Sequence, residues 1–212
     1  FEMETLDIRG VPTRTWKNGP KTLPEVFALG RSFGGREFLV YEGDRATYEG
    51  WARATLALAH AYQAAGVGKG DRVGLVMRNL PEWTVAFFAA ALVGAIIVPL
   101  NAWWTGPELE YGLADSGCKV AVVDAERYER IAEHLDHLPE LRQIWVARSD
   151  EEIAHPRVAH LEAVLGEVNS WGALPETEAP GVTVDPEDPA TIFYTSGTTG
   201  KPKGALGTHR TI

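Results

Sequence analysis

Short apolar runs alternate with helix-like stretches through the middle of the chain, and this alternation constrains the fold more than any other feature. Largely apolar strands are expected at 72–77, 95–100, 119–123 and 143–146. Helices are expected between them, at 81–93, from 106 to near 117, and from 125 to about 137. Strands that alternate with helices of this length form right-handed βαβ units, so the sequence predicts an α/β fold with a mainly parallel sheet flanked by helices.

Capping and turn residues mark further elements. Thr22 and Thr105 each begin a capping box, and the first of these predicts a short helix to about residue 33. Residues 37–48 have the pattern of a hairpin, and Thr47 can cap the helix that follows, which runs to Ala65. Residues 1–20 show no clear period and are expected to form an irregular arm.

A second feature is a loop rich in glycine and hydroxyl groups near the end of the chain. The apolar run 190–194 is typical of a buried strand, and it leads into the loop, which also carries two lysines. Glycines let backbone N–H groups converge on an anion, while hydroxyls and lysines add donors and positive charge. The candidate phosphate-binding residues are Thr195, Ser196, Gly197, Thr198, Thr199, Gly200, Lys201 and Lys203.

Two other interpretations of this loop are weaker. The P-loop of nucleotide triphosphatases has four residues between its glycines and a Ser or Thr after the lysine. Here two residues separate Gly197 from Gly200, and Pro202 follows Lys201. A flexible surface loop would not need a buried strand before it and two lysines at fixed spacing.

The segment Tyr194–Gly204 resembles the signature motif of the adenylate-forming superfamily, which contains acyl-CoA synthetases, peptide-synthetase adenylation domains and luciferases. Upstream segments are similar to further family motifs: Ala46-Thr47-Tyr48, Gly70-Asp71-Arg72-Val73, Asn79-Leu80-Pro81-Glu82, and Gly94-Ala95 with Val98-Pro99-Leu100-Asn101. The resemblance therefore covers nearly the whole chain. It implies that the chain is part of the large N-terminal domain of such an enzyme, and Asn101 favours an acyl-CoA synthetase over a peptide synthetase.

The resemblance implies activation of a carboxylic acid, here expected to be a fatty acid, by ATP. The acid would become an acyl-adenylate with release of pyrophosphate, and then a thioester of coenzyme A. Lys201 or Lys203 would offset the charge of the β- and γ-phosphates. Mg²⁺ would bridge the phosphates, with Thr195 as the candidate metal ligand.

The family's remaining motifs and its assisting lysine lie beyond Ile212, so no catalytic residue is expected within this fragment. We expect the fragment alone to be inactive and its missing partner to be the C-terminal part of the same chain. Two alternatives remain open: an adenylation domain for amino or aryl acids, and a non-catalytic nucleotide-binding module.

Composition limits the expected binding partners and the expected cellular location of the protein. The net charge of −9 argues against nucleic acid as a partner. The single cysteine, Cys118, is expected to be buried filler and suits a cytoplasmic protein. No run is long enough for a transmembrane segment, and no secretion signal is present at the start.

The chain is divided into four expected parts. They are an arm at 1–20, an α/β subdomain at 21–165, an acidic proline-rich connection at 166–189, and a strand, loop and truncated next subdomain at 190–212.

Several other polar or aromatic residues were considered as site residues. His134 and His137 have a spacing that can bind metal, but no third ligand is evident, so they are interpreted as exposed polar positions. His209 is interpreted as a local hydrogen-bonding residue at the start of a helix capped by Thr208. The pair Trp103-Trp104 follows a strand end and is expected to pack in the core or at the rim of a site.

Overall fold

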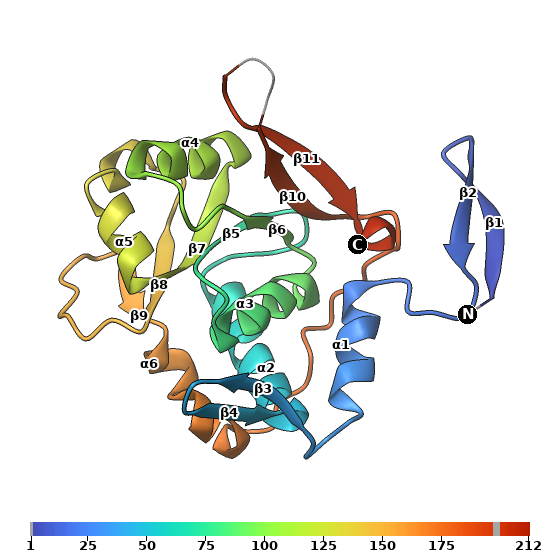
Figure 1. Cartoon of the computed structure of the whole chain (residues 1–212), viewed down its shortest axis with the longest axis horizontal. Helices are drawn as coiled ribbons and strands as arrows, with labels where there is room; N and C mark the ends of the chain where they lie inside the picture. The colour runs from blue at the N-terminus through green and yellow to red at the C-terminus, as the bar shows by residue number, and fades with distance from the viewer. Residues whose placement is uncertain (1, 197–199) are drawn as a thin grey trace.

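The structure is a computed structural model that describes residues 2–196 and 200–212. Its centre is a sheet built from β5 (Arg72–Val76), β6 (Ile96–Pro99), β7 (Cys118–Asp124), β8 (Gln143–Ala147), β9 (Val158–His160), β10 (Pro189–Thr195) and β11 (Lys203–Thr208). Within the described residues these seven strands have the order β11-β10-β6-β5-β7-β8-β9. All neighbours pair in parallel except β10 and β11, which are antiparallel. The predicted α/β fold with a mainly parallel sheet is confirmed (Figure 1).

Helices cover both faces of the sheet. One face packs against α2 (Tyr48–Ala64) and α3 (Pro81–Leu92), on which α1 (Leu23–Arg31) packs in turn. The other face packs against α4 (Gly106–Ser116) and α5 (Ala125–Ala132). Side chains alternate along each strand, so Val120 and Val122 of β7 belong to the first core while Ala121 and Val123 belong to the second. Both sets are buried, which explains why the strands have continuous apolar sequences.

The predicted helix starts agree with the structure. The side chains of Thr22, Thr47 and Asp124 each accept a hydrogen bond from a backbone N–H of the following first turn. Thr105 and Glu108 form the predicted capping box of α4. These helix starts could be predicted from the sequence because each depends on a capping side chain within three residues of the group that it binds.

The expected end of α5 near residue 137 was wrong. The helix ends at Ala132, and a tighter turn, η1 (Leu135–His137), follows. Leu135 and Leu138 are both buried in the second core. In a 3₁₀ turn, side chains three residues apart point in the same direction, so this turn directs both leucines into the core.

The prediction of an irregular arm at 1–20 was also wrong. Residues 3–16 form a hairpin of β1 (Met3–Ile8) and β2 (Val11–Trp16). Arg9 and Gly10 have φ values of 52° and 81°, as the turn of a two-residue hairpin requires. The second hairpin, β3 (Glu37–Tyr41) with β4 (Asp44–Thr47), is confirmed.

Residues 166–189 are only partly a surface connection. After α6 (Glu162–Leu165), the turn η2 (Val168–Ala173) packs on α2, and Trp171 is completely buried in the core. The burial of one large aromatic side chain orders this part, whereas 174–188 contains no helix or strand. The sheet itself continues across residue 190 through β10, and the four-part division of the chain stays a prediction.

The last described residues form a short 3₁₀ turn, η3 (His209–Thr211), where a helix was expected. Thr208 precedes this turn, but its hydroxyl makes no hydrogen bond among the described residues; instead its backbone N–H donates to the Thr211 hydroxyl at 2.8 Å. None of the helices in the described part of the chain combines the length and apolar character needed to cross a bilayer.

Candidate functional site

The ends of β10 and β11 extend beyond the body of the sheet, and the described residues of the loop between them, 196 and 200–202, lie at the carboxyl end of β10 (Figure 1). Thr195 and Lys203 face each other as the last paired residues of the hairpin, so they form the base of the loop. Ser196, Gly200 and Lys201 lie between them and are exposed. The other candidate loop residues, Gly197, Thr198 and Thr199, lie outside the described residues.

Side chains from α4 hold the two ends of this loop. The Tyr194 hydroxyl donates to Oδ2 of Asp115 at 2.6 Å, and the Tyr111 hydroxyl donates to the Pro202 carbonyl at 3.2 Å. Burial, together with the adjacent Asp115 carboxylate, raises the pKa of Tyr194 well above its ordinary value, so this hydroxyl stays a proton donor. The loop is therefore anchored to a helix on the second face of the sheet.

The two lysines of this loop, Lys201 and Lys203, are exposed. In the part of the chain that the structure describes, neither Lys201 nor Lys203 forms an ion pair, whereas Lys69 and Lys119 each bind an aspartate at 2.6 Å. The Lys201 ammonium lies over the ring of Tyr111, 5.2 Å from its centroid. These two charges are available to an anion.

The donor set at the loop fits a phosphate group. The hydroxyls of Thr195 and Ser196 are exposed beside the lysines, and Gly200 has a φ of 90°, which lets its backbone approach a ligand closely. The Thr195 hydroxyl is an oxygen ligand of the kind that Mg²⁺ takes. Neither the phosphate contacts nor the metal role of Thr195 is tested by the structure, and both stay predictions.

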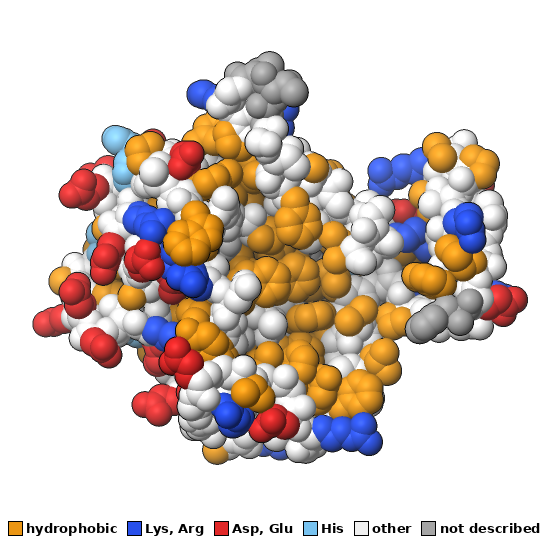
Figure 2. Space-filling view, in the orientation of Figure 1, with side chains coloured by type: hydrophobic (Ala, Val, Ile, Leu, Met, Phe, Trp, Pro, Cys, Tyr) orange, Lys and Arg blue, Asp and Glu red, His pale blue; other side chains and the backbone are white. Residues whose placement is uncertain are grey.

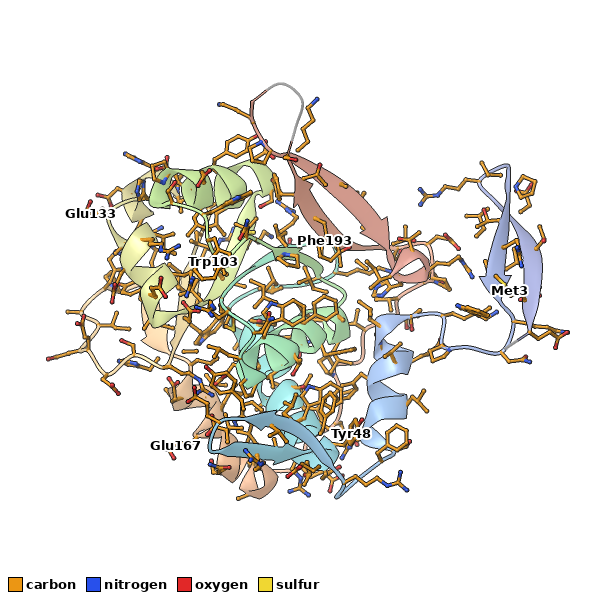
Figure 3. The ribbon with its side chains drawn as sticks, in the orientation of Figure 1. Met3, Tyr48, Trp103, Glu133, Glu167 and Phe193 are labelled. Carbon is orange, nitrogen blue, oxygen red and sulfur yellow. The ribbon has the colours of Figure 1, made fainter. Side chains whose placement is uncertain are left out.

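A cavity of about 540 Å³ lies at the carboxyl ends of β5 and β6, the edge at which open α/β sheets bind ligands. It is lined by Tyr41, Met77, Arg78, Asn79, Trp83, Leu100, Asn101, Ala102 and Trp103. Figure 2 shows apolar side chains running across this face of the molecule, and Figure 3 shows Trp103 beside the strand ends. The chain thus presents a hollow at the carboxyl ends of its central strands.

The two tryptophans occupy the rim, as expected. Trp103 is 67% exposed, and the Arg78 guanidinium lies 4.8 Å from its ring centroid. Trp104 is half-buried and meets Tyr194 edge to face at 5.9 Å. Arg127 supports the segment from beneath, since its Nε donates to the Ala102 carbonyl at 2.7 Å.

Sequence reasoning missed three residues that line the cavity or support its lining: Tyr41, Arg78 and Arg127. Arg127 is 1% exposed and pairs with Asp124, three residues earlier, which caps α5 at the end of β7. That spacing was a readable signal, because an arginine on the apolar side of a helix needs a nearby carboxylate. Tyr41 carried no such signal, since it reaches the cavity from the separate hairpin β3–β4.

Cys118 and His209 have structural environments. Cys118 is 1% exposed and free, and burial raises the pKa of its thiol to about 12, so it is filler and not a nucleophile, as expected. His209 is 4% exposed, and its Nδ1 accepts a hydrogen bond from the Leu23 N–H at 3.2 Å. Burial lowers the pKa of His209, which favours the neutral ring that this bond requires.

The interpretation of His134 and His137 as simple exposed positions was wrong for His134. Its side chain is 21% exposed, against 66% for His137, and both rings face the carboxylate of Glu110. The third group comes from α4, so the spacing of the histidines alone did not reveal it.

Comparison with known proteins gives consistent matches. A family model described as AMP-binding enzyme matches residues 27–212. The chain is 34% identical over 169 residues to 3-hydroxybenzoate–CoA/4-hydroxybenzoate–CoA ligase of Thauera aromatica, covering 78% of this chain and 30% of that protein. It is 32% identical over 168 residues to the long-chain-fatty-acid–CoA ligase FadD13 of Mycobacterium tuberculosis (strain CDC 1551 / Oshkosh), covering 79% and 30%.

A solved structure agrees with these sequence matches. The crystal structure of the anthranilate CoA ligase AuaEII in complex with anthranoyl-AMP superimposes with a TM-score of 0.75 at 26% identity, covering 89% of this chain and 35% of that one. The chain therefore spans about a third of the length of the proteins that it matches.

Proposed function

The chain belongs to the AMP-binding enzymes of the adenylate-forming superfamily, and on this premise we propose that it is the N-terminal part of an ATP-dependent acid–thiol ligase. The proposed reaction joins a carboxylic acid to the α-phosphate of ATP, releases pyrophosphate, and then transfers the acyl group to the thiol of coenzyme A. The observation that carries this proposal is a pair of exposed lysines, Lys201 and Lys203, which have no ion-pair partner in the described part of the chain and lie on an anchored loop at the carboxyl end of β10.

In this proposal the loop solves an electrostatic problem. A carboxylate must approach a triphosphate of the same charge sign, and pyrophosphate must then leave with the electrons of the broken bond. The Lys201 and Lys203 ammonium groups, with the hydroxyls of Thr195 and Ser196, would offset this repulsion and stabilise the departing phosphates. A bound Mg²⁺ would add positive charge at the same phosphates, with Thr195 as its proposed ligand.

The anchors of the loop are part of the same proposal. Tyr111 and Tyr194 fix both ends of the loop to α4, so the lysines would be held near the strand end before a nucleotide binds. Such preorganisation lowers the cost of ordering the loop around a charged ligand.

For the acid, our proposal is a fatty acid, on the match to a long-chain-fatty-acid–CoA ligase. An aromatic acid is the second candidate, because the hydroxybenzoate–CoA ligase and the anthranilate CoA ligase carry aromatic acids in their names. We further propose the cytoplasm as the location, on the single buried cysteine.

The test is ATP–pyrophosphate exchange by the complete gene product, against fatty acids of several lengths, benzoate derivatives and amino acids. Exchange that depends on one class of acid would support adenylation and identify the substrate class. No exchange with any acid, from a folded protein that still binds ATP, would favour a non-catalytic nucleotide-binding module.

A loop variant tests the assigned residues. The double substitution Lys201→Ala/Lys203→Ala should lower the exchange rate by at least about a hundredfold, since losing one transition-state donor costs about 10²–10³ in rate. Lys17→Ala is the matched control, because Lys17 is an exposed lysine on the N-terminal hairpin. Equal losses in both variants would contradict the role of the loop.

The 212-residue chain alone is proposed to be inactive. An exchange rate from these residues that requires both ATP and a carboxylic acid would refute that part of the proposal.

A further inference from the structure

Two histidines and a glutamate from separate elements converge where α4 meets the end of α5. Glu110 lies on α4, His134 lies between α5 and η1, and His137 ends η1. Oε2 of Glu110 is 2.5 Å from Nδ1 of His134 and 3.2 Å from Nδ1 of His137. The three atoms that could serve as ligands all lie within 4.8 Å of one another.

Backbone contacts hold the three side chains in place. The His137 N–H donates to the His134 carbonyl, and the His134 N–H donates to the Ile131 carbonyl, so one continuous turn positions both rings. The His134 ring also packs against Gly106, where an added Cβ would lie 2.5 Å from its Nε2. Gly106 is four residues before Glu110 on the same face of α4, so one helix both seats the ring and supplies the carboxylate.

The spacing suits a tetrahedral metal ion. Zinc binds histidine nitrogen and carboxylate oxygen at about 2.0–2.2 Å, which puts neighbouring tetrahedral ligands about 3.3 Å apart. The separation between Glu110 and His137, 3.2 Å, is close to this value, whereas Glu110 and His134 are hydrogen-bonded at 2.5 Å and would move apart by about 0.8 Å around an ion. Two imidazoles and one carboxylate are a ligand set that favours Zn²⁺ over Mg²⁺ or Ca²⁺, which prefer oxygen alone.

The surrounding charge favours a cation. Residues 124–140 contain six carboxylates and two arginines. Both arginines are engaged, because Arg127 pairs with Asp124 and Glu126, and Arg130 pairs with Glu126. Among the described residues, no lysine or arginine pairs with Glu110. Figure 2 shows acidic and histidine side chains gathered along this margin, and Figure 3 shows Glu133 on it.

We propose that Glu110, His134 and His137 bind one Zn²⁺ ion, which would tie α4 to the turn after α5. Three protein ligands leave the fourth position of the ion to water, because His137 lies at the exposed edge of the cluster. The site is separate from the proposed nucleotide loop, and the inference does not depend on the proposed function. The alternative is a hydrogen-bonded cluster of histidine and glutamate that binds no metal.

Titration of the metal-free complete gene product with Zn²⁺, followed by calorimetry, tests the proposal. The expected result is one high-affinity ion per chain, and Co²⁺ in its place should give the intense visible absorption of a four- or five-coordinate site. Glu110→Gln and His137→Ala should each weaken Zn²⁺ binding by at least about tenfold, because even loss of an outer-shell partner costs about 10–100-fold.

His60→Ala is the matched control, since His60 is an exposed histidine on α2, which packs on the opposite face of the sheet. This variant should bind Zn²⁺ as the unaltered protein does. His137 is exposed, so His137→Ala should keep the metal-free melting temperature, and Zn²⁺ should raise that temperature in the unaltered protein but not in this variant. Equal affinities in all three variants, or no binding by the unaltered protein, would overturn the proposal.

Discussion

Substitution of Arg148 should expose the cost of a buried carboxylate at the start of α3. Glu82 is 5% exposed, and its Oε1 accepts a hydrogen bond from Nε of Arg148 at 2.9 Å. Its other oxygen has no hydrogen-bond partner among the described residues. Burial raises the pKa of Glu82 above its ordinary value, even though Arg148 pulls it down. Arg148→Met would leave the carboxylate buried and without its cation.

We expect this substitution to lower the free energy of unfolding by about 2–3 kcal/mol at neutral pH. Removing one partner of a buried pair costs about 3–5 kcal/mol, and the side chain of Arg148 is 31% exposed, which reduces the effect. With a urea slope of about 2–3 kcal/mol per molar, the unfolding midpoint should fall by about 1 M. Asp44→Asn is the control, because Asp44 is the outer partner of Arg148 and should cost less than about 1 kcal/mol.

The pH dependence has a definite sign. Because the pKa of Glu82 is raised in the folded state, the folded protein holds the proton more tightly than the unfolded chain. The stability from this group is present below the ordinary pKa and is lost as the pH rises through the raised value. Loss of Arg148 raises this pKa further, so the deficit of the variant should be small near about pH 4–5 and largest above about pH 7.

A double-mutant cycle tests the reasoning. Glu82→Gln/Arg148→Met should be more stable than Arg148→Met alone by about 1 kcal/mol, since a neutral amide costs less to bury than an unpaired charge. Additive losses in the double variant, or a deficit that is equal at both pH values, would refute the account of Glu82.

Three further predictions concern packing and reactivity. Gly74→Ala should destabilise the protein by about 1–3 kcal/mol in urea unfolding, because its Cβ would lie 2.7 Å from Leu113; Gly181→Ala, with open space around it, should change little. Tyr194→Phe should cost about 0.5–1.5 kcal/mol by removing the donor to Asp115, and a stability equal to that of the unaltered protein would contradict this anchor. Cys118 should resist thiol reagents until the protein unfolds, which a labelling time course checks; rapid labelling of the folded protein would contradict the burial of this thiol.

The elements that sequence reasoning predicted are those with strong local signals. The starts of α1, α2, α4 and α5 depend on a capping side chain within three residues, and the central strands are apolar on both faces. The missed elements lacked such signals. The first hairpin turns on Arg9-Gly10, which is not among the usual turn pairs, and β9 has only three residues. The packing of Trp171 depends on contacts with α2, far away in the sequence.

In the candidate site, too, the sequence predicted the local features but not the contacts between distant segments. The loop lysines were predicted from the local sequence, which places them on a glycine- and hydroxyl-rich loop after an apolar run, but the anchoring of the loop by Tyr111 requires the fold, since Tyr111 lies 91 residues before Pro202. The convergence of Glu110 with His134 and His137 also spans two elements. Residue type and spacing indicate what kind of group a site could bind, whereas tertiary contacts determine which residues from other elements join that site.

The position of β10 in the sheet has a consequence for the order of folding. Thr191 of β10 pairs with Ile97 of β6, 94 residues earlier, whereas β5–β6 and β7–β8 join segments about a quarter as far apart. Contacts between distant segments form slowly, because a long loop must close before they contribute. During synthesis, the strands β6, β5, β7 and β8 can assemble before the loop between β10 and β11 has left the ribosome. The candidate nucleotide site would then be the last part of the sheet to form and, by the same reasoning, among the first to open.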